Sequence, residues 1–227
     1  MGTGAFASLR RHLEYDRLDA VVISHMHADH FIDIVPLRYA LRYGRVRREQ
    51  RLPLYLPPGG EAMLSRLVAA FSDEGAGDFL GEVFDVRTYD PAAPLRMGAA
   101  TLTFAPTRHY IPTFAMRYSC GGQSITYSAD TAPDPRVSDL ARGTDLFLCE
   151  ATLLAGDLET GERGHCSALE AAQMARMAGA RALCLTHYGE FSHARDLDES
   201  ARGRFTGEIF VADDHHVIPI GERVPAA

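Results

Sequence analysis

The stretch Ser24-His25-Met26-His27-Ala28-Asp29-His30 places three imidazoles and a carboxylate directly after the apolar run 20–23. A buried strand ending at Ser24 delivers these side chains to the rim of a sheet, where α/β proteins usually present their chemistry. Imidazole nitrogens and carboxylate oxygens are the ligands that zinc and similar first-row metals accept. The alternative is a surface loop of ordinary polar residues, but the spacing favours a metal site at a strand end.

The bulk composition fits one α/β domain over residues 1–227. A chain of 227 residues is long enough to bury a full core. Its net charge of −7 and its pI of about 5.8 predict a surface that repels nucleic acid as a whole. All 23 basic residues are arginine, so a Schiff base or a lysine nucleophile is excluded.

The cysteines and the hydropathy indicate the cellular compartment. Four widely spaced cysteines are expected to be reduced thiols of a cytosolic protein: Cys120, Cys149, Cys166 and Cys184. No apolar run approaches the roughly 18 residues that a membrane span needs, and the N-terminus lacks an export pattern. The sequence therefore predicts a soluble, cytoplasmic protein.

Hydrophobic periodicity predicts alternating strands and helices. Helices are expected over residues 5–13, 31–43, 61–71, 135–142, 167–178 and 195–204. Strands are expected over 20–24, 52–56, 83–89, 100–108, 113–120, 124–128, 145–149, 182–186, 208–211 and 217–220. Residues 72–81 are rich in glycine and acids and are expected to form a loop. His109, Asp130 and His187 then fall at the ends of predicted strands.

A basic cluster follows the predicted helix 31–43. It consists of Arg45, Arg47, Arg48 and Arg51. The cluster could steer an anionic substrate, but a solvated helix end is the simpler interpretation.

The opening motif resembles the signature of the metallo-β-lactamase superfamily. The resemblance implies an αββα sandwich of two mixed β-sheets flanked by helices. The first N-terminal strands of that fold are missing here, because the glycine-bearing turn that follows them in relatives stands at residues 2–4. A cut chain, a late assigned start or a trimmed first sheet would each account for this.

The same resemblance implies a ligand set for two divalent metal ions, zinc first, with manganese or iron as alternatives. One ion would be held by His25, His27 and His109, the other by Asp29, His30 and His187, with Asp130 bridging both. Two such metals can share a hydroxide and clamp the attacking and leaving oxygens of a phosphodiester. Asp29 therefore also belongs to the implied catalytic set.

A second constellation resembles the RNase Z-like branch of the superfamily. Ser167 and Glu170 are spaced as a capping box, which places His165 at a helix N-terminus, near bound anions. In that branch the corresponding histidine contacts the scissile phosphate and assists the leaving oxygen. A plain capping-loop histidine is the alternative. Glu150, in a Glu-Ala-Thr stretch shared with the branch, is expected to orient a ligand imidazole.

Departures from other branches narrow the chemistry. The best-known zinc β-lactamases carry cysteine where Asp130 stands, which disfavours lactam hydrolysis for this chain. Diiron flavoproteins carry glutamate at the position of His27, which disfavours oxygen reduction. RNase Z inserts a long basic arm between the residues matching His109 and Asp130, where this chain has only residues 110–129. Without that arm, tRNA binding loses its main electrostatic attraction.

The stretch Phe147-Leu148-Cys149-Glu150-Ala151, followed by His165 and by Leu185-Thr186-His187, resembles bacterial cyclic-nucleotide phosphodiesterases of the RNase Z-like group. The resemblance implies a phosphodiesterase that hydrolyses 3′,5′-cyclic nucleotides through a metal-bridging hydroxide. Its partner would be a small phosphodiester substrate, with no extended nucleic acid and no membrane. Three alternatives stay open: an RNase Z-like ribonuclease, a hydrolase of a lactone, thioester or sulfate ester, and an inactive binding domain. The apolar stretch 31–43 is either a homodimer surface or a buried core helix. Asp214, His215 and His216 are expected to be surface residues.

Overall fold

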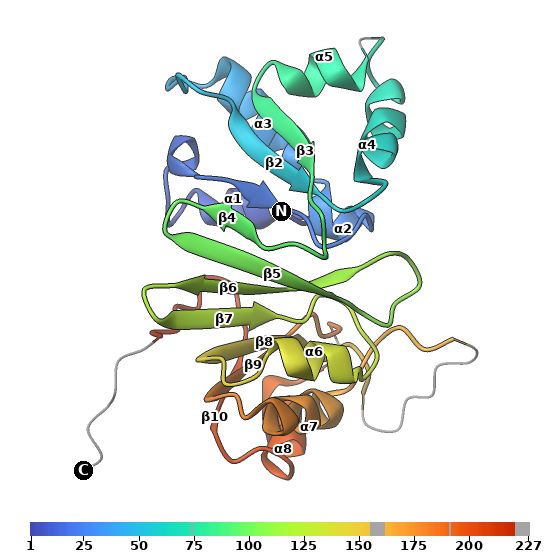
Figure 1. Ribbon diagram of the computed structural model, residues 1–227, viewed down its shortest axis with the longest axis vertical. Helices are drawn as coiled ribbons and strands as arrows, with labels where there is room; N and C mark the ends of the chain where they lie inside the picture. The colour runs from blue at the N-terminus through green and yellow to red at the C-terminus, as the bar shows by residue number, and fades with distance from the viewer. Residues whose placement is uncertain (74, 155–161, 191, 221–227) are drawn as a thin grey trace. The chain divides into compact units, whose positions relative to one another are not determined.

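The computed structural model describes residues 1–73, 75–154, 162–190 and 192–220. The chain divides into two compact units, Met1–Asp90 and Pro91–Ala227. Each unit has its own sheet and its own hydrophobic core (Figure 1). Both units combine strands with helices, which confirms the predicted α/β class.

The first unit is built on a parallel three-stranded sheet in the order β1-β2-β3. Its strands are β1 (Val21–Val22), β2 (Leu52–Leu56) and β3 (Phe84–Thr88). Parallel neighbours need crossover connections. Helix α3 (Ile34–Tyr43) supplies the first crossover, and helices α4 (Gly60–Ala69) and α5 (Ala76–Gly81) supply the second. Short helices α1 (Ala5–Leu9), η1 (Tyr15–Arg17) and α2 (Ala28–Phe31) complete the unit.

The core of this unit joins the helices to the sheet. Leu37 from α3 and Leu64 from α4 are buried with Leu54 and Leu56 of the central strand. The buried Tyr89 hydroxyl donates to the Ile23 carbonyl at 3.1 Å, just before the histidine-rich stretch. The carboxyl end of β1 is therefore anchored where the motif begins.

The second unit is built on a seven-stranded mixed sheet in the order β10-β9-β8-β7-β6-β5-β4. Its strands are β4 (Leu95–Met97), β5 (Ala100–Pro106), β6 (Phe114–Cys120), β7 (Gln123–Tyr127), β8 (Leu146–Glu150), β9 (Ala182–Thr186) and β10 (Glu208–Val211). Pairings from β4 to β7 are antiparallel, and those from β7 to β10 are parallel.

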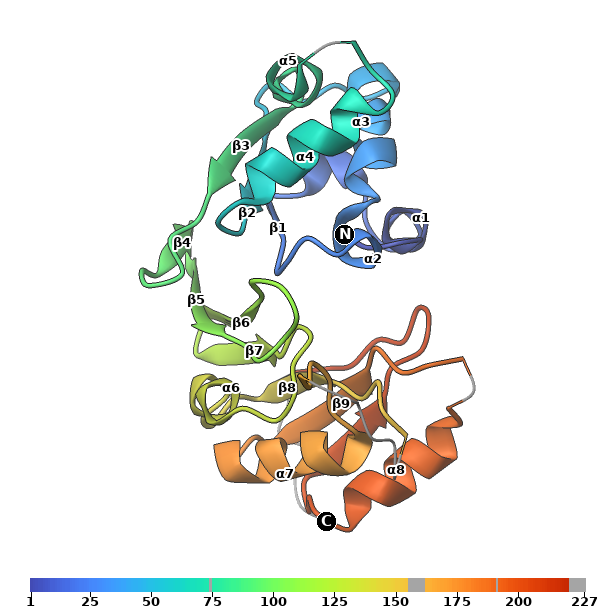
Figure 2. The ribbon, with the colours of Figure 1, turned by 90° about the vertical axis from the view of Figure 1, so that its right-hand side faces the viewer.

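Three helices cover one side of this sheet: α6 (Pro135–Leu140), α7 (Ala168–Ala178) and α8 (Ala194–Arg202) (Figure 2). Helix α7 buries small side chains, Ala171, Ala172 and Ala175, in the same core as Phe147 and Leu183. Small residues let the helix axis come close to the strands, so the parallel half of the sheet is tightly covered.

Most predicted elements are confirmed, three of them with the same bounds, over 52–56, 182–186 and 208–211. Two predictions are wrong. Part of the predicted loop 72–81 is helix α5, because Phe79 and Leu80 are buried in the core of the first unit. Residues 217–220 form no strand, and the three-residue strand β4 went unpredicted because it is too short to show a period.

The apolar stretch 31–43 is largely a core segment. Phe31, Ile34, Leu37 and Leu41 are buried, which supports the core-helix interpretation for them. The cysteines are all free, and three are buried; burial raises the pKa of the Cys184 thiol to about 11. None of the described helices combines the length and hydropathy needed to cross a bilayer.

A buried arginine gives the first unit a measurable dependence on one side chain. Arg38 of α3 donates through Nε to the Phe79 carbonyl at 2.9 Å, lies 4.0 Å from that ring's centroid and also binds Glu82. We expect Arg38→Ala to lower the free energy of unfolding by about 2–3 kcal/mol, measured by urea denaturation. Arg42, which pairs with the same Glu82 near the surface, is the matched control, and Arg42→Ala should change stability little. Equal losses would contradict a special role for Arg38.

Candidate metal centre

In the first unit, four predicted ligands gather in the loop after β1 and the first turn of α2. The His25 ring centroid lies 5.0 Å from that of His27 and 4.0 Å from that of His30. Asp29 Oδ2 lies 3.2 Å from His30 Nε2. His25 is fully buried, whereas the Asp29 side chain is 60% exposed. This end of the sheet therefore carries three imidazoles and one carboxylate close together, as the motif predicts.

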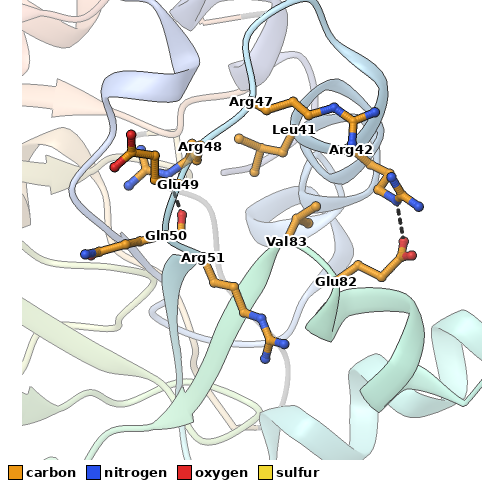
Figure 3. Close-up of a pocket in the computed structure, with 9 residues that line it drawn as sticks. All are labelled: Leu41, Arg42, Arg47, Arg48, Glu49, Gln50, Arg51, Glu82 and Val83. Atoms are coloured by element: carbon orange, nitrogen blue, oxygen red, sulfur yellow. Dashed lines mark hydrogen bonds and ion pairs between the residues drawn. The ribbon is translucent and has the colours of Figure 1, made fainter.

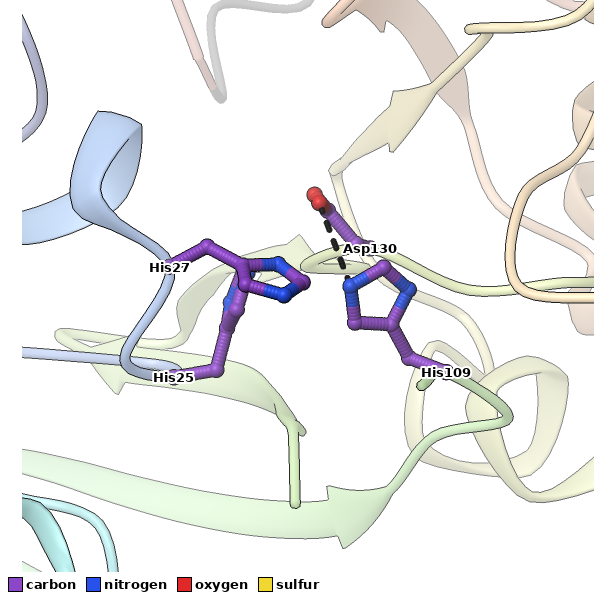
Figure 4. Close-up of side chains that lie close together, drawn as sticks. All are labelled: His25, His27, His109 and Asp130. Carbon is purple, nitrogen blue, oxygen red and sulfur yellow. Dashed lines mark ion pairs between the residues drawn. The ribbon is translucent and has the colours of Figure 1, made fainter. Parts of the chain in front are cut away.

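In the second unit, the remaining predicted residues lie around Asp130. Its Oδ2 is 3.7 Å from His109 Nε2 and 3.6 Å from His187 Nε2 (Figure 4 draws the first pair, with His25 and His27). These separations exceed hydrogen-bond length. Asp130, His165 and His187 each offer a ligand atom within 4.8 Å of the others. A buried carboxylate with several imidazole nitrogens facing it is the donor set that a divalent cation requires.

The backbone is left-handed at His187 and directly before Asp130. Ala129, just before Asp130, has φ 51°, and His187 has φ 54°. Each lies just beyond a strand, β7 or β9. Left-handed conformations are uncommon for residues with a Cβ and persist where the surrounding structure enforces them, often at functional sites. The sequence shows the strand ends but not this turn of the chain.

Hydrogen bonds fix which nitrogen of His109 can bind a metal. His109 Nδ1 lies 2.9 Å from the Gly164 carbonyl oxygen, which can only accept a hydrogen bond. Nδ1 must therefore carry the proton, and Nε2, on the Asp130 side, keeps its lone pair. A lone pair held in place by such a bond is how metal-binding histidines are oriented. His109 thus fits a metal ligand.

Thr152 fixes which ring nitrogen of His187 can bind a metal. Its hydroxyl donates to the His187 carbonyl at 2.9 Å and lies 2.8 Å from His187 Nδ1. Because the single hydroxyl proton is used on the carbonyl, Nδ1–H donates to the oxygen and Nε2 stays available. The sequence pointed to the Glu-Ala-Thr stretch but gave Thr152 no role.

Replacing Thr152 should weaken metal binding. We expect Thr152→Val to lower metal affinity by about 10- to 100-fold, since His187 loses the bond that orients it. Competition with a chromophoric chelator measures the affinity. Thr103→Val, on β5 of the same unit, is the matched control and should bind metal like the wild type. Unchanged affinity in Thr152→Val would show that this bond does not orient a ligand.

Glu150 orients the His165 imidazole through a hydrogen bond. Its Oε1 lies 3.0 Å from His165 Nδ1 and accepts a bond from the Thr131 amide at 2.6 Å. Glu150 is fully buried at the end of β8. The capping box of Ser167 and Glu170 is present at the start of α7. Glu150 was expected to orient a metal ligand; the imidazole that it contacts is the predicted catalytic His165.

Tyr110 is a neighbour that sequence reasoning missed. Its side chain is 49% exposed, and its ring centroid lies 4.9 Å from that of His109 and 5.7 Å from that of His165. A Cβ added at Gly164 would stand 2.5 Å from this ring, so only glycine allows the approach. Nothing in the local sequence marks Tyr110, because the contact joins separate segments. Asp214, His215 and His216 are exposed, as predicted.

Comparison with known proteins agrees with this chemistry. Residues 2–188 match the family profile described as "Beta-lactamase superfamily domain". The chain belongs to the metallo-β-lactamase superfamily. This superfamily member is 31% identical over 213 residues to "Probable metallo-hydrolase YhfI" of Bacillus subtilis (strain 168), covering 93% of the chain and 82% of that relative. The crystal structure of YhfI matches with a TM-score of 0.82 at 29% identity, over 94% of this chain and 83% of YhfI.

Two further relatives are similar over most of this chain. "Uncharacterized protein Rv1339" of Mycobacterium tuberculosis (strain ATCC 25618 / H37Rv) is 33% identical over 210 residues, 92% of this chain and 75% of the relative. A protein named ribonuclease Z from Nocardia farcinica (strain IFM 10152) is 34% identical over 170 residues, 73% of this chain and 50% of that protein. The superfamily member described here has the α/β metallo-β-lactamase fold and is a metal-dependent hydrolase, with the histidine and aspartate clusters typical of a binuclear centre.

Proposed function

We propose that this hydrolase is a binuclear metal-dependent phosphodiesterase that acts on 3′,5′-cyclic nucleotides. The observation that carries the proposal is His165, held by Glu150 beside the Asp130 and His187 ligand atoms. A hydrolase that relied on metal ions alone would not need an oriented imidazole next to its ligands. Departure of an alkoxide from phosphorus does need a proton donor, which an imidazole supplies near neutral pH.

The proposed ligand set is the one that the resemblance to the superfamily implies. It comprises His25, His27 and His109 for one ion, Asp29, His30 and His187 for the other, and Asp130 for both. When bound, the two ions supply Lewis acidity and an activated water. In the proposed reaction, water adds to phosphorus and the bond to the 3′ oxygen breaks. His165 donates the proton that this oxygen takes up. Asp29, a proposed metal ligand, is the second residue proposed as catalytic.

The second unit favours a small substrate. His109 and Asp130 are separated only by a short loop and the β6–β7 hairpin, with no basic arm between them. The half-exposed Tyr110 ring beside His165 offers an aromatic face for a nucleobase, a contact worth about 1–3 kcal/mol for bases that stack on aromatic side chains. The net charge of −7 disfavours a long polyanion.

A substrate panel tests the proposal. Purified, metal-loaded protein should release nucleoside monophosphate from cyclic AMP or cyclic GMP, followed by chromatography of the products. Chromogenic esters, a lactone and a thioester test the remaining hydrolase chemistries in parallel. Turnover confined to carboxylic or sulfate esters would overturn the proposal.

A ribonuclease is the second candidate, favoured by the similarity to the Nocardia protein named ribonuclease Z. That similarity covers half of the ribonuclease. A pre-tRNA with a 3′ trailer separates the candidates. Cleavage at the trailer together with inert cyclic nucleotides would replace the phosphodiesterase proposal by the ribonuclease.

A further inference from the structure

An arginine-rich pocket lies in the first unit, away from the histidine motif. It has a volume of about 340 Å³ and is lined by four arginines, Arg42, Arg47, Arg48 and Arg51, with the glutamates Glu49 and Glu82 and three uncharged residues (Figure 3). Four positive charges against two negative ones leave the lining basic, on a chain whose net charge is −7. Three arginines of the predicted basic cluster, Arg47, Arg48 and Arg51, therefore line this pocket after the helix end.

The position of the pocket separates it from the metal motif. Arg51 directly precedes β2, and Glu82 and Val83 directly precede β3, so the pocket lies at the amino ends of these strands. The Val83 carbonyl accepts a bond from the Leu52 amide at 2.8 Å, which joins the two strand starts. The histidine motif follows the carboxyl end of β1. In a parallel sheet, the amino ends and the carboxyl ends of the strands lie at opposite ends of the sheet. The pocket is therefore a different site from the histidine motif.

The four arginines fall into two kinds. Arg48 donates to the Leu18 carbonyl at 2.8 Å, and Arg42 donates to Glu82 at 3.0 Å, so hydrogen bonds to other segments of the chain hold both. Arg47 and Arg51 are exposed, and across the described residues neither guanidinium pairs with a carboxylate. Figure 3 shows their side chains reaching the pocket from different ends. The guanidiniums of Arg42 and Arg48 are therefore held in place, whereas those of Arg47 and Arg51 can turn their N–H groups toward a bound anion.

We propose that this pocket binds the phosphate group of a small anionic molecule. Guanidinium forks match phosphate oxygens in pairs, which makes arginine the preferred side chain for phosphate recognition. The volume lies in the range of small-molecule sites, roughly 300–1,000 Å³. Nucleic acid would need an extended basic surface, which the acidic chain does not provide.

Calorimetric titration with inorganic phosphate tests the proposal on the metal-loaded protein. The double variant Arg47→Gln, Arg51→Gln should weaken phosphate binding by about tenfold or more, because two charge-assisted donors are lost. The control Arg45→Gln, Arg66→Gln removes the same charge from exposed positions that do not line the pocket, and should change affinity less than about twofold. Binding of the wild type should weaken as salt rises.

Two further measurements separate this pocket from the metal centre. Asp130→Ala should keep phosphate binding at the pocket, and the double pocket variant should keep its hydrolytic activity within about twofold of the wild type. Phosphate binding that disappears in Asp130→Ala and survives in the pocket variant would overturn the proposal. Equal weakening in the pocket and control variants would do so as well, as would binding of an RNA oligonucleotide without binding of phosphate.

Discussion

Asp130→Ala is expected to lower hydrolysis by about 10³-fold or more, and added metal should not restore it. Asp130 is the one ligand proposed for both metal ions, and metal ions supply several kcal/mol of transition-state stabilisation. Its buried carboxylate lies 3.7 Å from His109 Nε2 and 3.6 Å from His187 Nε2, so its loss removes the centre of the cluster in the second unit. Activity measured against metal concentration gives the result.

His25→Ala provides the contrast. It removes a ligand from one proposed metal ion only, so excess metal should restore part of the activity by mass action. Asp139→Ala, the control for Asp130→Ala, removes an exposed carboxylate of the second unit and should behave like the wild type. Thermal unfolding of each variant checks that the fold is intact. Equal rescue of Asp130→Ala and His25→Ala would show that Asp130 does not bridge.

His165→Ala is expected to lower phosphodiester cleavage by about 10²-fold or more, the usual contribution of a general acid. The imidazole lies 3.0 Å from the buried Glu150 carboxylate and is stacked at 14° on the His187 ring, 5.8 Å away. The effect should appear mainly in kcat, because proton donation acts in the transition state. Steady-state kinetics with a cyclic nucleotide measures it.

The leaving group makes this second experiment specific. A phosphodiester with a p-nitrophenolate leaving group needs little protonation, so His165→Ala should slow its cleavage much less than that of a cyclic nucleotide. His193→Ala, an exposed histidine of the same unit, should leave both rates unchanged. Equal slowing of both substrates would mean that His165 only supports the structure of the site.

The sequence by itself determined the elements that depend on local pattern. Strand β2 has the bounds that its apolar run predicts, and the histidine stretch follows β1 as the motif requires. The capping box of Ser167 and Glu170 formed as predicted. Side-chain type and spacing along a few residues are enough for such features, because period, capping and ligand chemistry act within one or two turns.

Tertiary structure alone decided the features that join distant segments. Helix α5 forms where a loop was predicted, because Phe79 and Leu80 have a core to enter that the local composition does not reveal. Thr152 orients His187 across 35 positions, and Tyr110 meets the backbone at Gly164. Such partners are chosen by strand order and close packing, which set distances between side chains that sequence separation leaves open.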